Sequence, residues 1–172
     1  MFSILNRRAF LRLTAVTTMM PALSMAAEEV IELNWSDMVP PGGETVTQRL
    51  QGLGIIPHDE MSTLRAEQPP SSGVRTDFNG KIVRIPGYMV PLETSGSGVT
   101  AFILVPYVGA CIHVPPPPAN QMVFVTTEKP YESSGLFEAV NVTGMFGTAS
   151  VSTQLADIGY ALSADVIEPF YL

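Results

Sequence analysis

Residues 81–105 read KIVRIPGYMVPLETSGSGVTAFILV, and this stretch decides the fold. Its first part, residues 81–92, is rich in β-branched and aromatic residues, and Gly87 stands where a strand can bulge or bend. A turn sequence at 94–98 follows, and residues 99–105 are then a nearly continuous apolar run. We therefore predict two strands joined by a tight turn.

Three later segments have the same character and complete the predicted set of strands. They are residues 121–127 (QMVFVTT), 136–145 (LFEAVNVTGM) and 160–171 (YALSADVIEPFY). Five strands spaced roughly 10–20 residues apart, with breaks rich in Gly and Pro between them, are typical of small barrels and sandwiches. We predict a mainly β domain over residues 77–172, a small five-stranded OB-like barrel or sandwich.

The residues that precede this domain have a different character. Residues 27–76 contain scattered apolar positions, proline pairs and polar turns, and within them residues 44–56 could form a single weak helix. His58 belongs to a Pro-His-Asp-Glu cluster in the second half of the segment. We predict an extended or partly helical N-terminal arm and linker, either exposed or draped over the barrel.

The composition excludes several classes of function. The 172 residues include 9 Lys+Arg and 16 Asp+Glu, which gives a formal net charge of −7. A chain this acidic, without a basic cluster, is a poor binder of nucleic acid, because phosphate contacts need Lys and Arg. The single cysteine excludes an intramolecular disulfide and a two-cysteine zinc finger. A hydrophobic fraction of 46% is enough for a packed core.

The first 26 residues have the features of a twin-arginine signal peptide. Arg7 and Arg8 are followed by Phe10 and Leu11, and a weakly apolar stretch ends in small residues near Ala26. This stretch is about 13 residues long, and a helix needs roughly 20 to span a bilayer. We expect export to the periplasm, cleavage near Ala26 and no membrane span in the mature protein. An uncleaved N-terminal anchor is the alternative.

Residues 107–121, YVGACIHVPPPPANQ, carry the candidate chemistry. Cys111 and His113 are two positions apart, so on an extended backbone their side chains leave the same face. A thiolate and an imidazole are both zinc ligands. The candidates for the completing ligand are His58 and the acids Asp37, Asp59, Glu60 and Glu93. The first functional hypothesis is therefore an accessory protein that binds zinc through Cys111, His113 and His58.

The prolines after this pair support a second hypothesis, a non-catalytic interaction module. Residues 115–118 are all proline, which fixes φ, removes backbone donors and favours a stiff polyproline II strut. A partner could dock on this strut and on the residues that flank it. The candidate interaction residues are Tyr107, Pro115, Pro116, Pro117, Pro118 and Asn120.

Two further interpretations of Cys111 remain open. A lone cysteine is most often a small buried hydrophobic residue. A thiol-dependent enzyme with Cys111 as nucleophile is the third functional hypothesis, and it needs a base that hydrogen-bonds the thiol. Side chains two apart on a strand usually lie too far apart for this, so we assign no catalytic residue.

The motif GACIHVPPPP at 109–118 resembles the hallmark of an exported bacterial domain family of unknown function. Residues 35–40, WSDMVP, are similar to the family's opening Trp-x-Asp-Leu-x-Pro motif with Met38 in place of leucine, and the resemblance covers residues 34–171. Genes of this family often lie beside those for ABC transporters and a His-rich periplasmic protein, in clusters sometimes under zinc-dependent repression. The resemblance implies a periplasmic accessory protein, with zinc as candidate cofactor and the periplasmic part of an ABC transporter as candidate partner.

Overall fold

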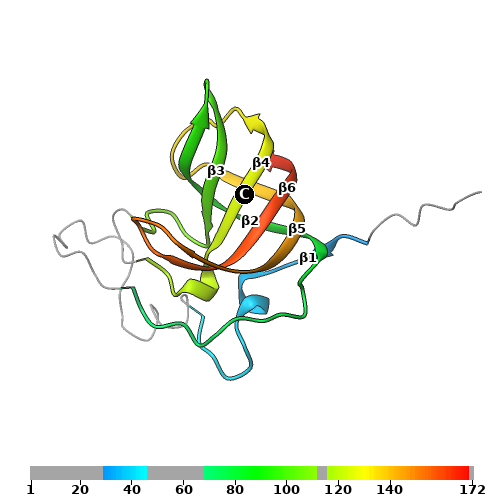
Figure 1. Cartoon of the computed structure of the whole chain (residues 1–172), viewed down its shortest axis with the longest axis vertical. Helices are drawn as coiled ribbons and strands as arrows, with labels where there is room; N and C mark the ends of the chain where they lie inside the picture. Colours follow the sequence, from blue (N-terminus) through cyan, green and yellow to red (C-terminus); the bar gives the residue numbers. More distant parts are fainter. Residues whose placement is uncertain (1–28, 46–67, 112–115, 171–172) are drawn as a thin grey trace, which may run out of the picture.

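The computed structural model of the chain describes residues 29–45, 68–111 and 116–170. Within these residues the regular structure is almost entirely β-strand, with two short 3-10 helices (Figure 1). The strands are β1 (Ile31–Glu32), β2 (Lys81–Ser95), β3 (Gly98–Val105), β4 (Val123–Tyr131), β5 (Ala139–Ser152) and β6 (Asp157–Pro169), and the helices are η1 (Trp35–Met38) and η2 (Ala119–Gln121). The predicted mainly β fold is confirmed.

Strands β2 to β6 close into a barrel. Their order is β2-β3-β4-β6-β5, and β5 pairs with β2 to complete the circle. Closure is possible because β2 is long enough to pair twice, with β5 through residues 81–88 and with β3 through residues 88–95. Strands β4 and β6 run parallel, and the other barrel pairs are antiparallel. This five-stranded, OB-like connectivity agrees with the prediction.

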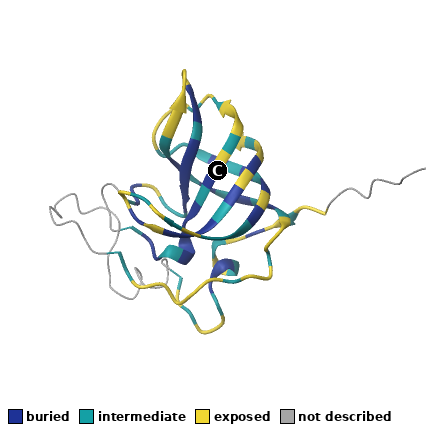
Figure 2. Ribbon diagram, in the orientation of Figure 1, coloured by how far each residue is buried: buried dark blue, intermediate teal, exposed yellow. Residues whose placement is uncertain are grey.

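Alternate residues of the strands fill the barrel. Val83, Ile85 and Met89 of β2 share one buried cluster with Val123 and Val125 of β4. Successive side chains on a strand point to opposite faces, so the residues between these positions face outward. The result is the banding of buried and exposed positions along the strands in Figure 2.

Several strand boundaries differ from the prediction. β2 and β4 run on to Ser95 and Tyr131, beyond the predicted ends at residues 92 and 127, and β5 begins at Ala139 and not at residue 136. β4 begins at Val123 and not at Gln121, because the preceding residues form η2. The end of β5 and the start of β6 also lie beyond the predicted ranges. The two strands form a hairpin that is paired up to Ser152 and Asp157, next to the turn.

Gly87 allows the close approach of two side chains to β2. The pairing of β2 with β5 runs without a shift through Gly87, and the register shifts of β2 lie between Pro91 and Thr94. A Cβ at position 87 would come within 2.8 Å of the Leu104 side chain and 3.0 Å of the Trp35 ring. A bulge, one of the two predicted roles of Gly87, is therefore wrong.

Two segments outside the barrel lie across one of its ends, and we call residues 29–45 and 68–78 together the end cover. Both run below the barrel in the view of Figure 1. Trp35 Nε1 donates a hydrogen bond to the Pro86 carbonyl at 2.7 Å, and Met38 is completely buried in the barrel cluster. The described part of the predicted arm thus packs on the barrel.

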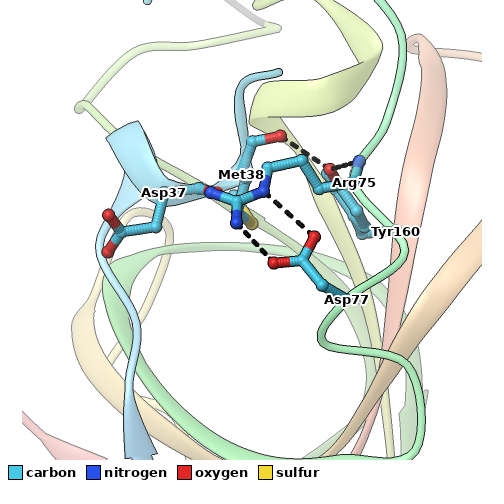
Figure 3. A network of polar contacts seen from close by, with 5 residues as sticks. All are labelled: Asp37, Met38, Arg75, Asp77 and Tyr160. Atoms are coloured by element: carbon cyan, nitrogen blue, oxygen red, sulfur yellow. Dashed lines mark hydrogen bonds and ion pairs between the residues drawn. The ribbon is translucent and has the colours of Figure 1, made fainter. Parts of the chain in front are cut away.

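A tyrosine inside the barrel fastens the end cover in place (Figure 3). The Tyr160 hydroxyl on β6 donates to the Met38 carbonyl at 2.6 Å and accepts from the backbone N–H of Arg75 at 2.7 Å. The Arg75 guanidinium in turn donates to the Asp37 carbonyl at 2.7 Å and forms an ion pair with Asp77. Burial raises the pKa of Tyr160, so the hydroxyl remains a donor at neutral pH.

The closest approach of β5 to β6 gives a test of the barrel register. A Cβ at Gly144 would overlap the carbonyl oxygen of Ser163, whereas at Gly147 of the same strand the nearest atom lies at 3.8 Å. We expect Gly144→Ala to lower the free energy of unfolding by about 2–3 kcal/mol, because backbone must move. Gly147→Ala is the matched control and should change it by less than about 1 kcal/mol. Urea unfolding measures both, and equal effects would contradict the register.

Candidate functional site

The motif segment connects β3 to β4, and the structure describes it at residues 106–111 and 116–122. Nearly all of the candidate helix at 44–56 lies outside the described residues. The predicted site residues that also lie outside them are His58, His113 and Pro115, together with the signal residues Arg7, Arg8, Phe10 and Leu11. The site is therefore built from Tyr107, Cys111 and the second half of the motif.

Cys111 packs against a second apolar cluster, which lies on the outer side of the barrel wall. Phe102 and Leu104 of β3 belong to the barrel interior, so the alternating residue Ile103 faces outward, and it is nevertheless buried. Tyr107 and Cys111 are half-buried against this cluster. We call it the outer cluster, and its buried members are Val90, Ile103, Val105, Ala110, Met122, Ala156 and Ile158.

Burial controls the protonation of the thiol. It raises the pKa of Cys111 to about 11. The pKa of Tyr107 is raised as well, first by burial and then by the neighbouring Cys111. The thiolate is the reactive form of cysteine, so a thiol with this pKa is a weak nucleophile at neutral pH.

The backbone at Cys111 is unusual. Its φ is 70°, in the left-handed region that residues other than glycine adopt uncommonly. Gly109, two residues earlier, has φ 87°. The chain therefore makes a sharp change of direction where the Cys-x-His pair begins.

The zinc prediction has one ligand whose position is described. Residues 29–45, 68–111 and 116–170 contain no group of three or more His, Cys, Asp or Glu side chains that could hold a metal ion. Cys111 is the predicted ligand among them, and the other two, His113 and His58, lie outside these ranges. Zinc binding stays a prediction.

The second half of the motif is held against the body of the protein. Pro117 and Pro118 are buried and Pro116 is half-buried. Asn120 is 1% exposed, and its Nδ2 donates to Ser72 Oγ at 2.9 Å and to the Gly73 carbonyl at 2.8 Å. These residues anchor the described second half of the motif to the end cover.

Two glutamines that the sequence analysis did not single out complete the anchor. Gln121 Nε2 donates to the Trp35 carbonyl at 2.7 Å. Gln68 Nε2 donates to the carbonyls of Pro117 and Asp157, both at 2.8 Å, and so joins the motif segment to the β5–β6 hairpin. Their partners are distant in sequence, and no local pattern marks these bonds.

The raised thiol pKa predicts the reactivity of Cys111 and tests the enzyme hypothesis. We expect iodoacetamide to alkylate the folded chain at pH 7.5 about 100-fold more slowly than the urea-unfolded chain, because the pKa rises from 9.0 to about 11. The rate on the folded chain should increase about tenfold per pH unit toward pH 11. Mass spectrometry of timed samples measures both rates. Fast alkylation that levels off below pH 8 would instead indicate an activated thiol.

Neither helix in the described segments has the length and apolar character needed to cross a membrane.

Comparison with known proteins places the chain in a family. Residues 35–169 match the model of a family described as "Protein of unknown function (DUF3299)". The chain is also similar to a DUF3299 family protein from Pseudomonas aeruginosa PAO1, whose crystal structure is known at 2.45 Å resolution. The two are 36% identical with a TM-score of 0.68, and the match covers 84% of this chain and 98% of the other. No curated protein matches the chain. The chain belongs to the DUF3299 family of proteins of unknown function.

Proposed function

We propose that this chain is a periplasmic accessory protein that docks a partner non-catalytically through the β3–β4 connection, and that the partner is the periplasmic part of an ABC transporter. Export is supported by the twin-arginine sequence with Arg7 and Arg8. The transporter is the partner that the GACIHVPPPP resemblance implies. Docking as the activity is supported by the geometry of the connection.

The anchoring of residues 116–121 carries the proposal. Side-chain amides join this segment to three other parts of the molecule: η1 through Gln121, residues 72–73 through Asn120, and the β5–β6 hairpin through Gln68. A loop held in this way loses little conformational freedom when a partner binds, and such preorganisation favours affinity.

The surface available to a partner lies at the start of the connection. Val108 is 56% exposed, although its neighbours Tyr107 and Cys111 pack against the outer cluster. An exposed apolar side chain on an anchored loop is suited to contact another protein. Pro117 and Pro118 are buried, so in this proposal they support the surface and do not form it.

The same region does not support the enzyme hypothesis. A cysteine nucleophile needs a lowered pKa or an adjacent base, and burial moves the pKa of Cys111 in the opposite direction. This favours docking over thiol catalysis.

Site-specific cross-linking tests the docking proposal. A photo-reactive amino acid at Val108 should cross-link a transporter subunit in cells that produce the full-length chain together with its neighbouring genes. The same amino acid at Val166, which is 46% exposed on β6, is the matched control and should give no such product. Mass spectrometry identifies the adduct. No transporter adduct at position 108, or equal adducts at both positions, would overturn the proposal.

Zinc binding is the second candidate function. The left-handed backbone of Cys111 supports a functional role for this residue, although it is not the extended backbone from which the shared face of Cys111 and His113 was expected. Backbone held in a sparsely populated conformation occurs more often at functional sites. We expect the protein, purified from the periplasm without chelator, to contain near-stoichiometric zinc that Cys111→Ser loses. His113→Gln and His58→Gln should each lower the zinc content, because each removes a predicted ligand. Elemental analysis measures it, and absence of zinc from the unmodified protein would exclude this function.

A further inference from the structure

The only Asn-Gly pair in the sequence, Asn79–Gly80, lies where the end cover leads into β2 (Figure 1). Both residues are exposed, and Gly80 has φ 72° in the turn before the strand. Asparagine followed by glycine is prone to spontaneous deamidation, because glycine has no Cβ to keep its backbone nitrogen away from the asparagine side chain. The pair is therefore a candidate site of covalent modification.

The reaction takes its atoms from these two residues and one water molecule. The Gly80 nitrogen loses its proton and attacks Cγ of Asn79, the bond between Cγ and Nδ2 breaks, and ammonia leaves with a proton. The product is a succinimide ring. Water then opens the ring at either of its two carbonyl groups and gives Asp or isoAsp. In isoAsp the main chain runs through Cβ and Cγ, so it is longer by one atom.

In the folded chain the attacking nitrogen is engaged elsewhere. The Gly80 N–H donates a hydrogen bond to the Phe146 carbonyl of β5 at 2.9 Å. The electron pair that attacks Cγ is the one left behind when this proton is removed. The hydrogen bond therefore retains the proton and directs the nitrogen toward Phe146, away from the alignment with Cγ that the reaction needs.

The side chain that is attacked is also held by β5. Asn79 Oδ1 accepts from the backbone N–H of Thr148 at 2.8 Å, and Nδ2 donates to Thr148 Oγ1 at 3.1 Å. Two bonds to one residue fix the plane of the amide group. We call these two bonds and the Gly80–Phe146 bond the clasp, and it continues the pairing of β2 with β5 beyond the Lys81–Phe146 pair.

We propose that Asn79–Gly80 is a site of spontaneous deamidation that is accessible to reaction only when the clasp opens. The reaction then belongs to the unfolded chain and to local opening at this end of the β2–β5 pairing. IsoAsp adds its main-chain atom directly before the Gly80–Phe146 bond, so a chain modified in this way has to shift the start of the pairing when it refolds. The proposal is independent of the docking function.

The rate of deamidation tests the site. The folded full-length chain is compared with the same chain unfolded in guanidinium chloride, at one mildly alkaline pH. Mass spectrometry of the peptide that contains residue 79 measures the conversion, and chromatography separates its Asp and isoAsp forms. Conversion should be at least about tenfold slower in the folded chain. Equal rates, or no conversion in the unfolded chain, would overturn the proposal.

Two variants test the clasp. Thr148→Val removes the hydroxyl that accepts from Nδ2 and keeps the backbone N–H, so deamidation of the folded chain should become about threefold faster. Thr143→Val alters another half-buried threonine of β5 that is not part of the clasp, and should leave the rate unchanged. Circular dichroism verifies that both variants are folded. Equal rates in the two variants would contradict the role of the clasp.

Hydrogen exchange of the Gly80 amide decides the question even if Thr148→Val does not fold. In the unmodified chain this amide should exchange at least about tenfold more slowly than in the unfolded chain, because its N–H is bonded to Phe146. NMR measures the exchange. Exchange at the rate of the unfolded chain would show that the clasp is absent and would refute the proposal.

Discussion

The Tyr160 hydroxyl joins both segments of the end cover to the interior of the barrel. A tyrosine in a barrel interior must find a partner for its hydroxyl, and Tyr160 finds two, the Met38 carbonyl and the Arg75 N–H (Figure 3). These partners belong to the two separate segments of the end cover. Both segments are thereby held by one buried group, and Arg75 ties them directly to each other through the Asp37 carbonyl.

The motif depends on this arrangement. The end cover supplies the acceptors of the motif's hydrogen bonds. The Trp35 carbonyl accepts from Gln121, and Ser72 Oγ and the Gly73 carbonyl accept from Asn120. Each of these acceptors lies only a few residues before Met38 or Arg75. Loosening the end cover would therefore release the anchored half of the motif.

The barrel could be predicted from the sequence, and its covering could not. Apolar and β-branched runs between Gly- and Pro-rich breaks are a local pattern, so the five barrel strands and the fold class could be predicted from it. The prediction fails where long-range contacts decide. Gly87 has no bulge but lies close to the Leu104 and Trp35 side chains, and η2 replaces the expected start of β4. The anchor through Gln68 and Gln121 joins residues 86 and 89 positions apart, for which the sequence has no local signal.

The candidate site shows why residue type alone is ambiguous. The Cys-x-His pair predicts metal ligation, whereas a lone cysteine predicts apolar packing. Cys111 is the member of the pair that the structure describes, and it packs against the outer cluster on the barrel wall. Its position therefore fits apolar packing. The four prolines predict a strut on which a partner docks, but Pro117 and Pro118 are buried. The Pro117 carbonyl accepts a hydrogen bond from the Gln68 side chain, which helps to hold the segment against the protein. The described residues 116–121 are thus fixed to the rest of the protein by side-chain amides, and the sequence pattern, which marks the prolines, does not identify the distant partners that fix them.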